Sequence, residues 1–218
     1  MGKLYFLGGE TVVRRDAKNV NAMAFQDAGG APAALVFPWA RASFDTAYKR
    51  RKRLTDYFRS LGAQSVSFSE YSDLSEEIAA KVACADLLYL TGGQVSVLAA
   101  RAKAKGLDQL LREYPGVVVG RSAGAVIMGR RCMVTNRYSG SRKIVGGLGL
   151  VDFSVKAHYQ PAHDNMLRRF SMKEKTFAIP HGSALVYERG SGALTFLGEV
   201  FVFEKGEKTA LNEATENT

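Results

Sequence analysis

The chain has 218 residues, 46% of them hydrophobic and 23% charged, and its 30 Lys and Arg against 21 Asp and Glu give a formal net charge of +9. This composition is typical of a soluble globular protein and excludes a disordered chain, a collagen-like fibre and a coiled coil. The length predicts a single α/β domain over residues 1–218, with a frayed tail over 207–218.

Several kinds of site are not expected. The apolar runs fall short of the roughly 20 residues that span a bilayer, and the apolar stretch at the N-terminus is too short for a signal peptide. Cys84 and Cys132 lie outside any Cys-x-x-Cys pattern, and we find no cluster of metal-ligand residues. We therefore expect a cytoplasmic protein without a metal, a cofactor or a membrane partner; the oligomeric state stays open.

Short apolar runs alternate with segments of helical periodicity through most of the chain. Strands are predicted over 3–7, 33–38, 65–68, 87–91 and 116–120. Helices are predicted over 44–61, 74–82, 95–104 with an extension over 107–113, and 123–128. Apolar strands that alternate with helices favour a parallel sheet covered on both faces. The predicted fold class is therefore α/β, with a doubly wound, mostly parallel sheet.

The pattern changes after about residue 129. A strand is expected over 153–157, and 184–188, 193–197 and 199–204 look like short antiparallel strands joined by glycine turns. We therefore add a small antiparallel C-terminal portion to the predicted fold.

The densest cluster of positive charge is the run from Lys49 to Arg53. It lies inside the predicted helix 44–61, so an amphipathic helix with a solvated basic face explains it better than phosphate binding does. A nucleic-acid partner is therefore not expected. If one existed, its affinity would fall steeply with salt.

The most informative motif is Gly-Arg-Ser-Ala-Gly, centred on Ser122 and preceded by the apolar strand 116–120. A strand that enters Gly-x-Ser-x-Gly and a helix that leaves it form a nucleophile elbow, which raises the serine above the sheet edge. Small flanking residues are needed because larger ones would collide with the neighbouring strand and helix. The Ala123 N–H, at the start of the helix, can then face a developing oxyanion. The alternative is a tight turn whose serine only caps the helix.

A serine nucleophile needs a base, and the chain offers His158, His163 and His181. His158 follows the strand predicted over 153–157. Active-site groups in open α/β sheets gather at the carboxyl ends of strands, so we favour His158. The turn 91–94, which contains Gly93, ends another strand at the same edge, where a backbone amide can approach a ligand closely. An ordinary strand-to-helix turn explains that segment equally well.

These segments resemble peptidase E, the aspartyl dipeptidase family of serine peptidases to which cyanophycinase is related. The similar stretches, in order, are Leu-Thr-Gly-Gly-Gln (90–94), Gly-Arg-Ser-Ala-Gly-Ala (120–125), Gly-Leu-Gly-Leu (147–150), Ala-His-Tyr (157–159) and Ile-Pro-His-Gly-Ser (179–183).

The resemblance covers roughly residues 3–205. It implies a class I glutamine amidotransferase-like fold, a Ser122 nucleophile, a His158 base, and oxyanion donors at Gly93 and Ala123. It also implies a small acidic peptide as substrate, because family members cleave dipeptides with an N-terminal aspartate or the aspartyl links of cyanophycin. Arg168 and Arg169 fall roughly where peptidase E carries an arginine that binds the aspartate side chain.

One departure concerns the third member of the catalytic triad. Where peptidase E has an acid, this chain has Arg137, and no Asp or Glu lies between Ala123 and Val151. Neutral candidates for orienting the imidazole are Asn136 and Gln160, since an asparagine does this in papain-like proteases.

Two interpretations follow from this departure. The first is a serine peptidase that acts on short acidic peptides through Ser122 and His158. The second, motivated by Arg137, is a non-catalytic relative that binds a small acidic ligand or a partner. Labelling of Ser122 by a serine-directed probe would distinguish the two.

Overall fold

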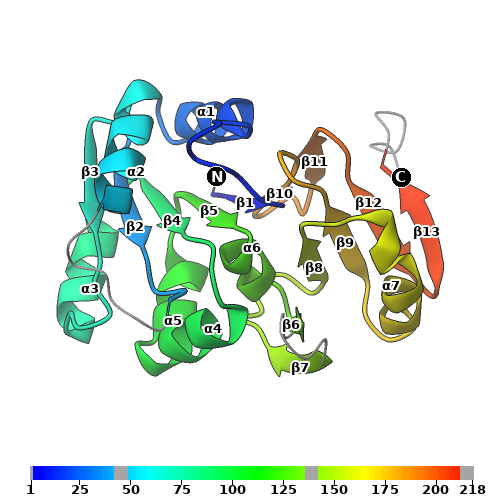
Figure 1. The fold of residues 1–218 in the computed structure, drawn as a ribbon. Helices are drawn as coiled ribbons and strands as arrows, with labels where there is room; N and C mark the ends of the chain where they lie inside the picture. The colour runs from blue at the N-terminus through cyan, green and yellow to red at the C-terminus, as the bar shows by residue number, and fades with distance from the viewer. Residues whose placement is uncertain (1, 42–48, 136–141, 212–218) are drawn as a thin grey trace.

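The computed structural model, shown in Figure 1, describes residues 2–41, 49–135 and 142–211. Its main sheet has seven strands in the order β11-β10-β1-β5-β4-β2-β3. The strands from β1 to β3 in that order are parallel, while β10 and β11 extend one edge in antiparallel pairing. The bounds are β1 (Lys3–Leu7), β2 (Ala33–Phe37), β3 (Ser65–Phe68), β4 (Leu87–Leu90), β5 (Val117–Arg121), β10 (Ala184–Glu188) and β11 (Leu194–Leu197).

Helices cover both faces of this sheet, as the alternation of apolar strands and helices predicts (Figure 1). On one face lie α1 (Lys18–Asp27) and α2 (Lys49–Ser60), packed on Tyr5 and Tyr89. On the other lie α3 (Ser75–Ala83), α4 (Val95–Ala104), α5 (Leu107–Glu113) and α6 (Ala123–Met128), packed on Phe6 and Leu90. Successive strand side chains enter opposite cores because the side-chain period of a strand is two.

A second sheet of four strands has the order β13-β12-β9-β8. Its strands are β8 (Ser154–Ala157), β9 (Thr176–Ile179), β12 (Phe201–Glu204) and β13 (Glu207–Ala210). The β8–β9 pair is parallel, and the other two pairs are antiparallel. One 3-10 turn, η1 (Pro161–His163), leads into α7 (Asp164–Ser171), which contributes Leu167 to a small core with Phe203.

The C-terminal part corrects two of our expectations. The tail predicted to be frayed over 207–218 contains β13, because residues 207–210 pair with β12; residues 212–218 lie outside the described residues. The three predicted antiparallel strands also do not form one unit. β10 and β11 join the main sheet beside β1, whereas β12 joins the second sheet.

The sequence patterns missed several elements. These are α1, η1, α7, β9, β13 and a separate hairpin of β6 (Arg131–Thr135) and β7 (Arg142–Gly146). The stretch 95–113 also forms two helices rather than one, because Gly106 takes the left-handed conformation (φ 66°) that separates them. Among the described residues, no helix is long and apolar enough to cross a bilayer.

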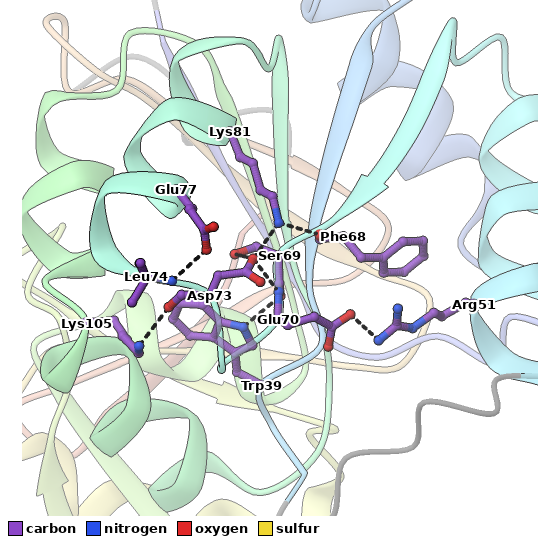
Figure 2. A network of polar contacts seen from close by, with 10 residues as sticks. All are labelled: Trp39, Arg51, Phe68, Ser69, Glu70, Asp73, Leu74, Glu77, Lys81 and Lys105. Carbon is purple, nitrogen blue, oxygen red and sulfur yellow. Dashed lines mark hydrogen bonds and ion pairs between the residues drawn. The ribbon is translucent and has the colours of Figure 1, made fainter.

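The loop between β3 and α3 is held by a network of polar contacts, drawn in Figure 2. The Asp73 carboxylate accepts hydrogen bonds from the Glu70 backbone N–H at 2.9 Å and from Lys81 Nζ at 2.5 Å. The Trp39 indole N–H donates to the Ser69 carbonyl at 2.8 Å. Burial alone would raise the pKa of Asp73. The hydrogen bonds from Lys81 and the loop backbone outweigh burial and hold this pKa below its usual value.

The basic cluster on α2 is partly paired. Arg51 forms an ion pair with Glu70 of the loop in Figure 2, and Lys52 pairs with Asp56 at 2.8 Å. Arg53 is exposed to solvent, as a solvated basic face requires.

Candidate active site

Ser122 lies at the turn between β5 and α6 with a backbone conformation (φ 54°, ψ −107°) that non-glycine residues rarely adopt. Its N–H donates to the Leu7 carbonyl at 2.9 Å, and its carbonyl accepts from the Val126 N–H at 3.0 Å. These two hydrogen bonds hold a sharp strand-to-helix turn. The side chain is left half-buried at the carboxyl edge of the main sheet.

The two positions that flank Ser122 require glycine, because the backbone of neighbouring elements occupies the space that a side chain would need. A Cβ at Gly120 would lie 2.6 Å from the Ala125 backbone nitrogen in α6. A Cβ at Gly124 would lie 2.3 Å from the Leu90 carbonyl oxygen in β4. The helix and the strand therefore each exclude a side chain, in agreement with the reason that the Gly-x-Ser-x-Gly spacing predicts.

His158 follows β8, and the structure brings it to Ser122: the Oγ and Nε2 atoms lie 2.8 Å apart. His158 also has a positive φ, 51°, and its N–H donates to the Gly8 carbonyl at 2.8 Å. The consecutive carbonyls of Leu7 and Gly8, at the end of β1, thus receive the amides of Ser122 and His158. The end of β1 is the common support that positions the two residues.

Gly9 and His181 enclose the His158 ring. A Cβ at Gly9 would lie 2.3 Å from His158 Cε1 and 2.5 Å from Nδ1, so the glycine backbone packs directly against the imidazole. The His181 ring stacks on the His158 ring with centroids 5.6 Å apart and an interplanar angle of 30°. His181 Nδ1 lies 3.4 Å from Asp16 Oδ2, which fixes the second ring. No sequence pattern indicated a role for Gly9 or Asp16.

A buried ion pair lies beneath the elbow. The Glu10 side chain is 0% exposed, and its Oε2 lies 3.6 Å from Nη1 of Arg121, which is 17% exposed. Asn21 Nδ2 donates to Glu10 Oε1 at 3.0 Å, and the Tyr89 hydroxyl donates to Oε2 at 3.3 Å. Burial raises the pKa of Tyr89 far above its usual range. The positive charge of Arg121 opposes this rise and the negative charge of Glu10 adds to it, so the Tyr89 hydroxyl keeps its proton and remains a donor. The pair joins the loop after β1 to the residue before Ser122.

The turn predicted to supply an oxyanion donor lies beside the elbow. A Cβ at Gly92 would lie 3.2 Å from Ser122 Cβ, so the end of β4 approaches the serine closely. Gly93 has a φ of 154° and packs against Ala40, whose carbonyl a Cβ would approach to 2.4 Å. The other predicted donor, the N–H of Ala123, is the first of α6. Both donors remain predictions.

The third member of the triad stays open. Asn136 and Arg137 lie outside the described residues. Gln160 lies two residues beyond His158 with an exposed side chain, and its backbone N–H donates to His163 Nδ1 at 3.0 Å.

The nearest acid after His158 is Asp164. It accepts hydrogen bonds from the Tyr159 hydroxyl at 2.5 Å and from Lys208 Nζ at 3.0 Å. Burial alone would raise its pKa, but these two donors hold the pKa below its usual value. The Asp164 carboxylate is therefore already paired with Tyr159 and with Lys208 of the second sheet.

The two arginines predicted to bind the substrate lie on different sides of α7. Arg168 donates to the Gly206 carbonyl at 2.8 Å and lies 3.6 Å from Glu207, so it faces the β12–β13 turn. Arg169 is exposed and lines a groove with the β6–β7 hairpin. Among the described residues, no three His, Cys, Asp or Glu side chains are placed to hold a metal ion.

Comparison with known proteins finds similarity to peptidases. An uncharacterized peptidase of Listeria monocytogenes is 28% identical over 132 residues, which are 55% of this chain and 64% of that protein, so the chain aligns with less than two thirds of it. A peptidase from an acI-B1 actinobacterium has a similar fold, with a TM-score of 0.77 and 20% identity over 97% of this chain and 94% of that one.

A second solved structure, the "Putative Peptidase E Protein" of Listeria monocytogenes EGD-e, matches with a TM-score of 0.68 and 21% identity over 91% of this chain and 100% of that chain. The model of peptidase family S51 matches residues 7–195, which include the elbow, both stacked histidines and the buried ion pair. Because this match covers most of the sequence, the chain belongs to peptidase family S51.

Proposed function

We propose that this protein is a serine peptidase of the peptidase E type that hydrolyses short aspartyl peptides. The observation that carries the proposal is the 2.8 Å contact between Ser122 Oγ and His158 Nε2 at the end of a strained elbow. A serine and a histidine within hydrogen-bond reach form the nucleophile and base of acyl transfer. The membership of family S51 supports the same chemistry.

In the proposed reaction, Ser122 Oγ attacks the scissile carbonyl while His158 Nε2 takes its proton. The resulting oxyanion is stabilised by the N–H groups of Ala123 and Gly93. His158 then gives the proton to the leaving amine, and the acyl-enzyme forms. A water molecule, deprotonated by the same imidazole, cleaves this ester and returns the free serine.

The acidic substrate is inferred from the resemblance to peptidase E and from the net charge of +9, which attracts anionic ligands. Of the two candidate arginines, Arg169 suits this role better because Arg168 already binds the Gly206 carbonyl. A guanidinium can hold a carboxylate with two hydrogen bonds. We therefore expect substrates with Asp to be cleaved and their Asn counterparts to be poor substrates.

The test is covalent labelling by a small fluorophosphonate, followed by intact mass. We expect one equivalent on the wild type, and none on Ser122→Ala or His158→Ala with an unchanged melting temperature. His163→Ala is the matched control, since His163 Nδ1 accepts from the Gln160 backbone, and it should label normally. A folded wild type that neither labels nor cleaves any aspartyl dipeptide would overturn the proposal and favour the non-catalytic relative that Arg137 suggests.

The orienting residue can be identified in the same assay. We propose Asn136 or Gln160 for this role, because a neutral amide oxygen can hold an imidazole in the correct tautomer. Replacing the orienting residue by Ala should slow labelling by orders of magnitude without unfolding the protein, and replacing the other should not. Normal labelling of both variants would show that neither orients His158.

A further inference from the structure

We propose that a basic groove between the β6–β7 hairpin and α7 binds an acidic segment of the peptide substrate. The groove has a volume of about 420 Å³, within the range of about 300–1,000 Å³ of small-ligand sites. The proposal rests on the proposed function for the nature of the substrate. It adds a binding site that lies outside the Ser122–His158 pair.

The charge of the groove is of one sign. Among the described residues, four exposed cations line it and no acid does; the cations are Arg131, Lys143, Arg169 and Lys173. Within the described part of the chain, none of the four forms an ion pair. The neighbouring cations on the other side of α7 differ, because Arg168 lies 3.6 Å from Glu207 and Lys175 lies 3.5 Å from Glu204.

Unpaired like charges repel one another, so gathering them on one surface lowers stability unless an anion joins them. The cations that face the β12–β13 hairpin meet acids, while those that face the groove do not. This contrast within one helix and its following turn indicates an acidic occupant.

The floor of the groove is apolar. It consists of Met133, Ile144, Met166 and Phe170, and Ile144 is 52% exposed. Met133 and Ile144 are directly opposite each other in the hairpin. Met166 and Phe170 are one helical turn apart on α7 and share a face. A peptide with acidic side chains and intervening apolar ones complements both the rim and this floor.

A nucleic-acid strand fits the groove less well. Proteins bind single strands by stacking successive bases on aromatic side chains, and among the described residues that line the groove Phe170 is the only aromatic one. Methionine and isoleucine instead provide an adaptable apolar surface for aliphatic side chains. We therefore assign the groove to a peptide.

The position of the groove also relates it to Ser122 and His158. The β6–β7 hairpin follows α6, the helix that begins after Ser122, and β6 packs against β8. α7 follows His158 after the short η1 turn. In Figure 1 the hairpin lies below β8, and α7 lies to the right of β9. The two walls are thus the segments that follow the proposed nucleophile and base.

The binding test uses Ser122→Ala protein, so that no peptide is consumed. A fluorescent peptide of alternating Asp and Leu is titrated at low ionic strength, with the Asn-Leu peptide and a single-stranded RNA as comparisons. We expect binding of the Asp-Leu peptide alone. Arg169→Gln with Lys173→Gln should weaken it on the order of tenfold, because two exposed charge contacts are lost.

The matched control is Arg53→Gln with Arg59→Gln, which removes two exposed cations from α2 and changes the net charge equally. This control should bind the peptide as the parent does. Equal weakening by both pairs, no binding at low salt, or tighter binding of the RNA through Arg169 and Lys173 would each overturn the proposal.

A kinetic test on the active enzyme separates this proposal from the proposed function. Removing the cations of Arg169 and Lys173 should raise KM for a long acidic peptide about tenfold and leave its kcat unchanged. KM for an aspartyl dipeptide should rise through the loss of Arg169, which the proposed function assigns to the substrate carboxylate, whereas a Lys173→Gln single variant should raise KM for the long peptide and leave KM for the dipeptide unchanged. An unchanged KM for the long peptide would refute peptide binding in the groove without affecting the proposed peptidase activity. Absent turnover with intact peptide binding would refute only the peptidase.

Discussion

Gly9 is the position where the smallest change should affect the proposed base most. In Gly9→Ala the new Cβ would lie 2.3 Å from His158 Cε1, 2.5 Å from His158 Nδ1 and 2.8 Å from His181 Cδ2. Ordinary contacts of a Cβ begin at 3.4 Å, so the His158 ring must recede by about 1 Å. Gly9 does not have a positive φ, and alanine therefore adds no backbone strain.

A shift of about 1 Å would break the 2.8 Å contact between Ser122 Oγ and His158 Nε2, because hydrogen bonds to a hydroxyl rarely exceed about 3 Å. Misplacement by this amount costs on the order of 100-fold in rate. We therefore expect Gly9→Ala to label with fluorophosphonate, and to cleave an aspartyl dipeptide, about 100-fold more slowly than the wild type. The colliding atoms belong to side chains, so the melting temperature should change by only a few degrees.

Gly146→Ala is the matched control for this experiment. Its new Cβ would meet only the flexible Lys103 Nζ, at 3.1 Å, and Gly146 lies at the end of β7. It should label at the wild-type rate. If folded Gly9→Ala also labels at the wild-type rate, then the packing of Gly9 against the imidazole does not position the His158 ring.

Three further predictions concern stability. Gly124→Ala should lower the free energy of unfolding, measured in urea, by about 1–3 kcal/mol. The reason is that its Cβ would lie 2.3 Å from a β4 carbonyl oxygen that cannot move freely. Glu10→Gln should cost about 2 kcal/mol, which is below the roughly 3–5 kcal/mol of a fully buried broken pair, because Arg121 keeps 17% exposure; adding Arg121→Met should recover part of that loss in a double-mutant cycle. Asp73→Asn should destabilise the protein at neutral pH, but the difference from wild type should shrink as the pH falls below about 5. The sign follows from the lowered pKa of Asp73: the stability that it contributes is present above the unfolded pKa and is lost as the pH falls through the folded pKa and the carboxylate is protonated.

These three predictions have distinct refuting outcomes. A wild-type urea midpoint for Gly124→Ala would show that β4 can move to accommodate the Cβ without a loss of stability. Additive losses in the Glu10 and Arg121 cycle would show that the two groups do not interact. A difference between wild type and Asp73→Asn that stays constant down to low pH would show that the Asp73 carboxylate is not preferentially charged in the folded state.

Local patterns in the sequence determined the parallel part of the fold. The parallel strands 3–7 and 65–68 and the helices 95–104 and 123–128 have the predicted bounds, because the local apolar pattern indicates where each element begins and ends. The elbow at Ser122 was also predictable. Its two glycines are required by close contact with the adjoining helix and strand, and that requirement is written in the spacing of five consecutive residues.

Only the tertiary structure decided which distant segments meet. The Leu7 and Gly8 carbonyls bind the amides of Ser122 and His158, and Gly9 packs on the imidazole; these contacts join residues more than 100 positions apart. No local pattern encodes them. The same holds for β10, which lies beside β1 rather than with β12, and for the groove between the β6–β7 hairpin and α7. Pairing between distant strands depends on which arrangement of the whole chain buries the apolar faces of the sheet, so local sequence patterns do not determine it.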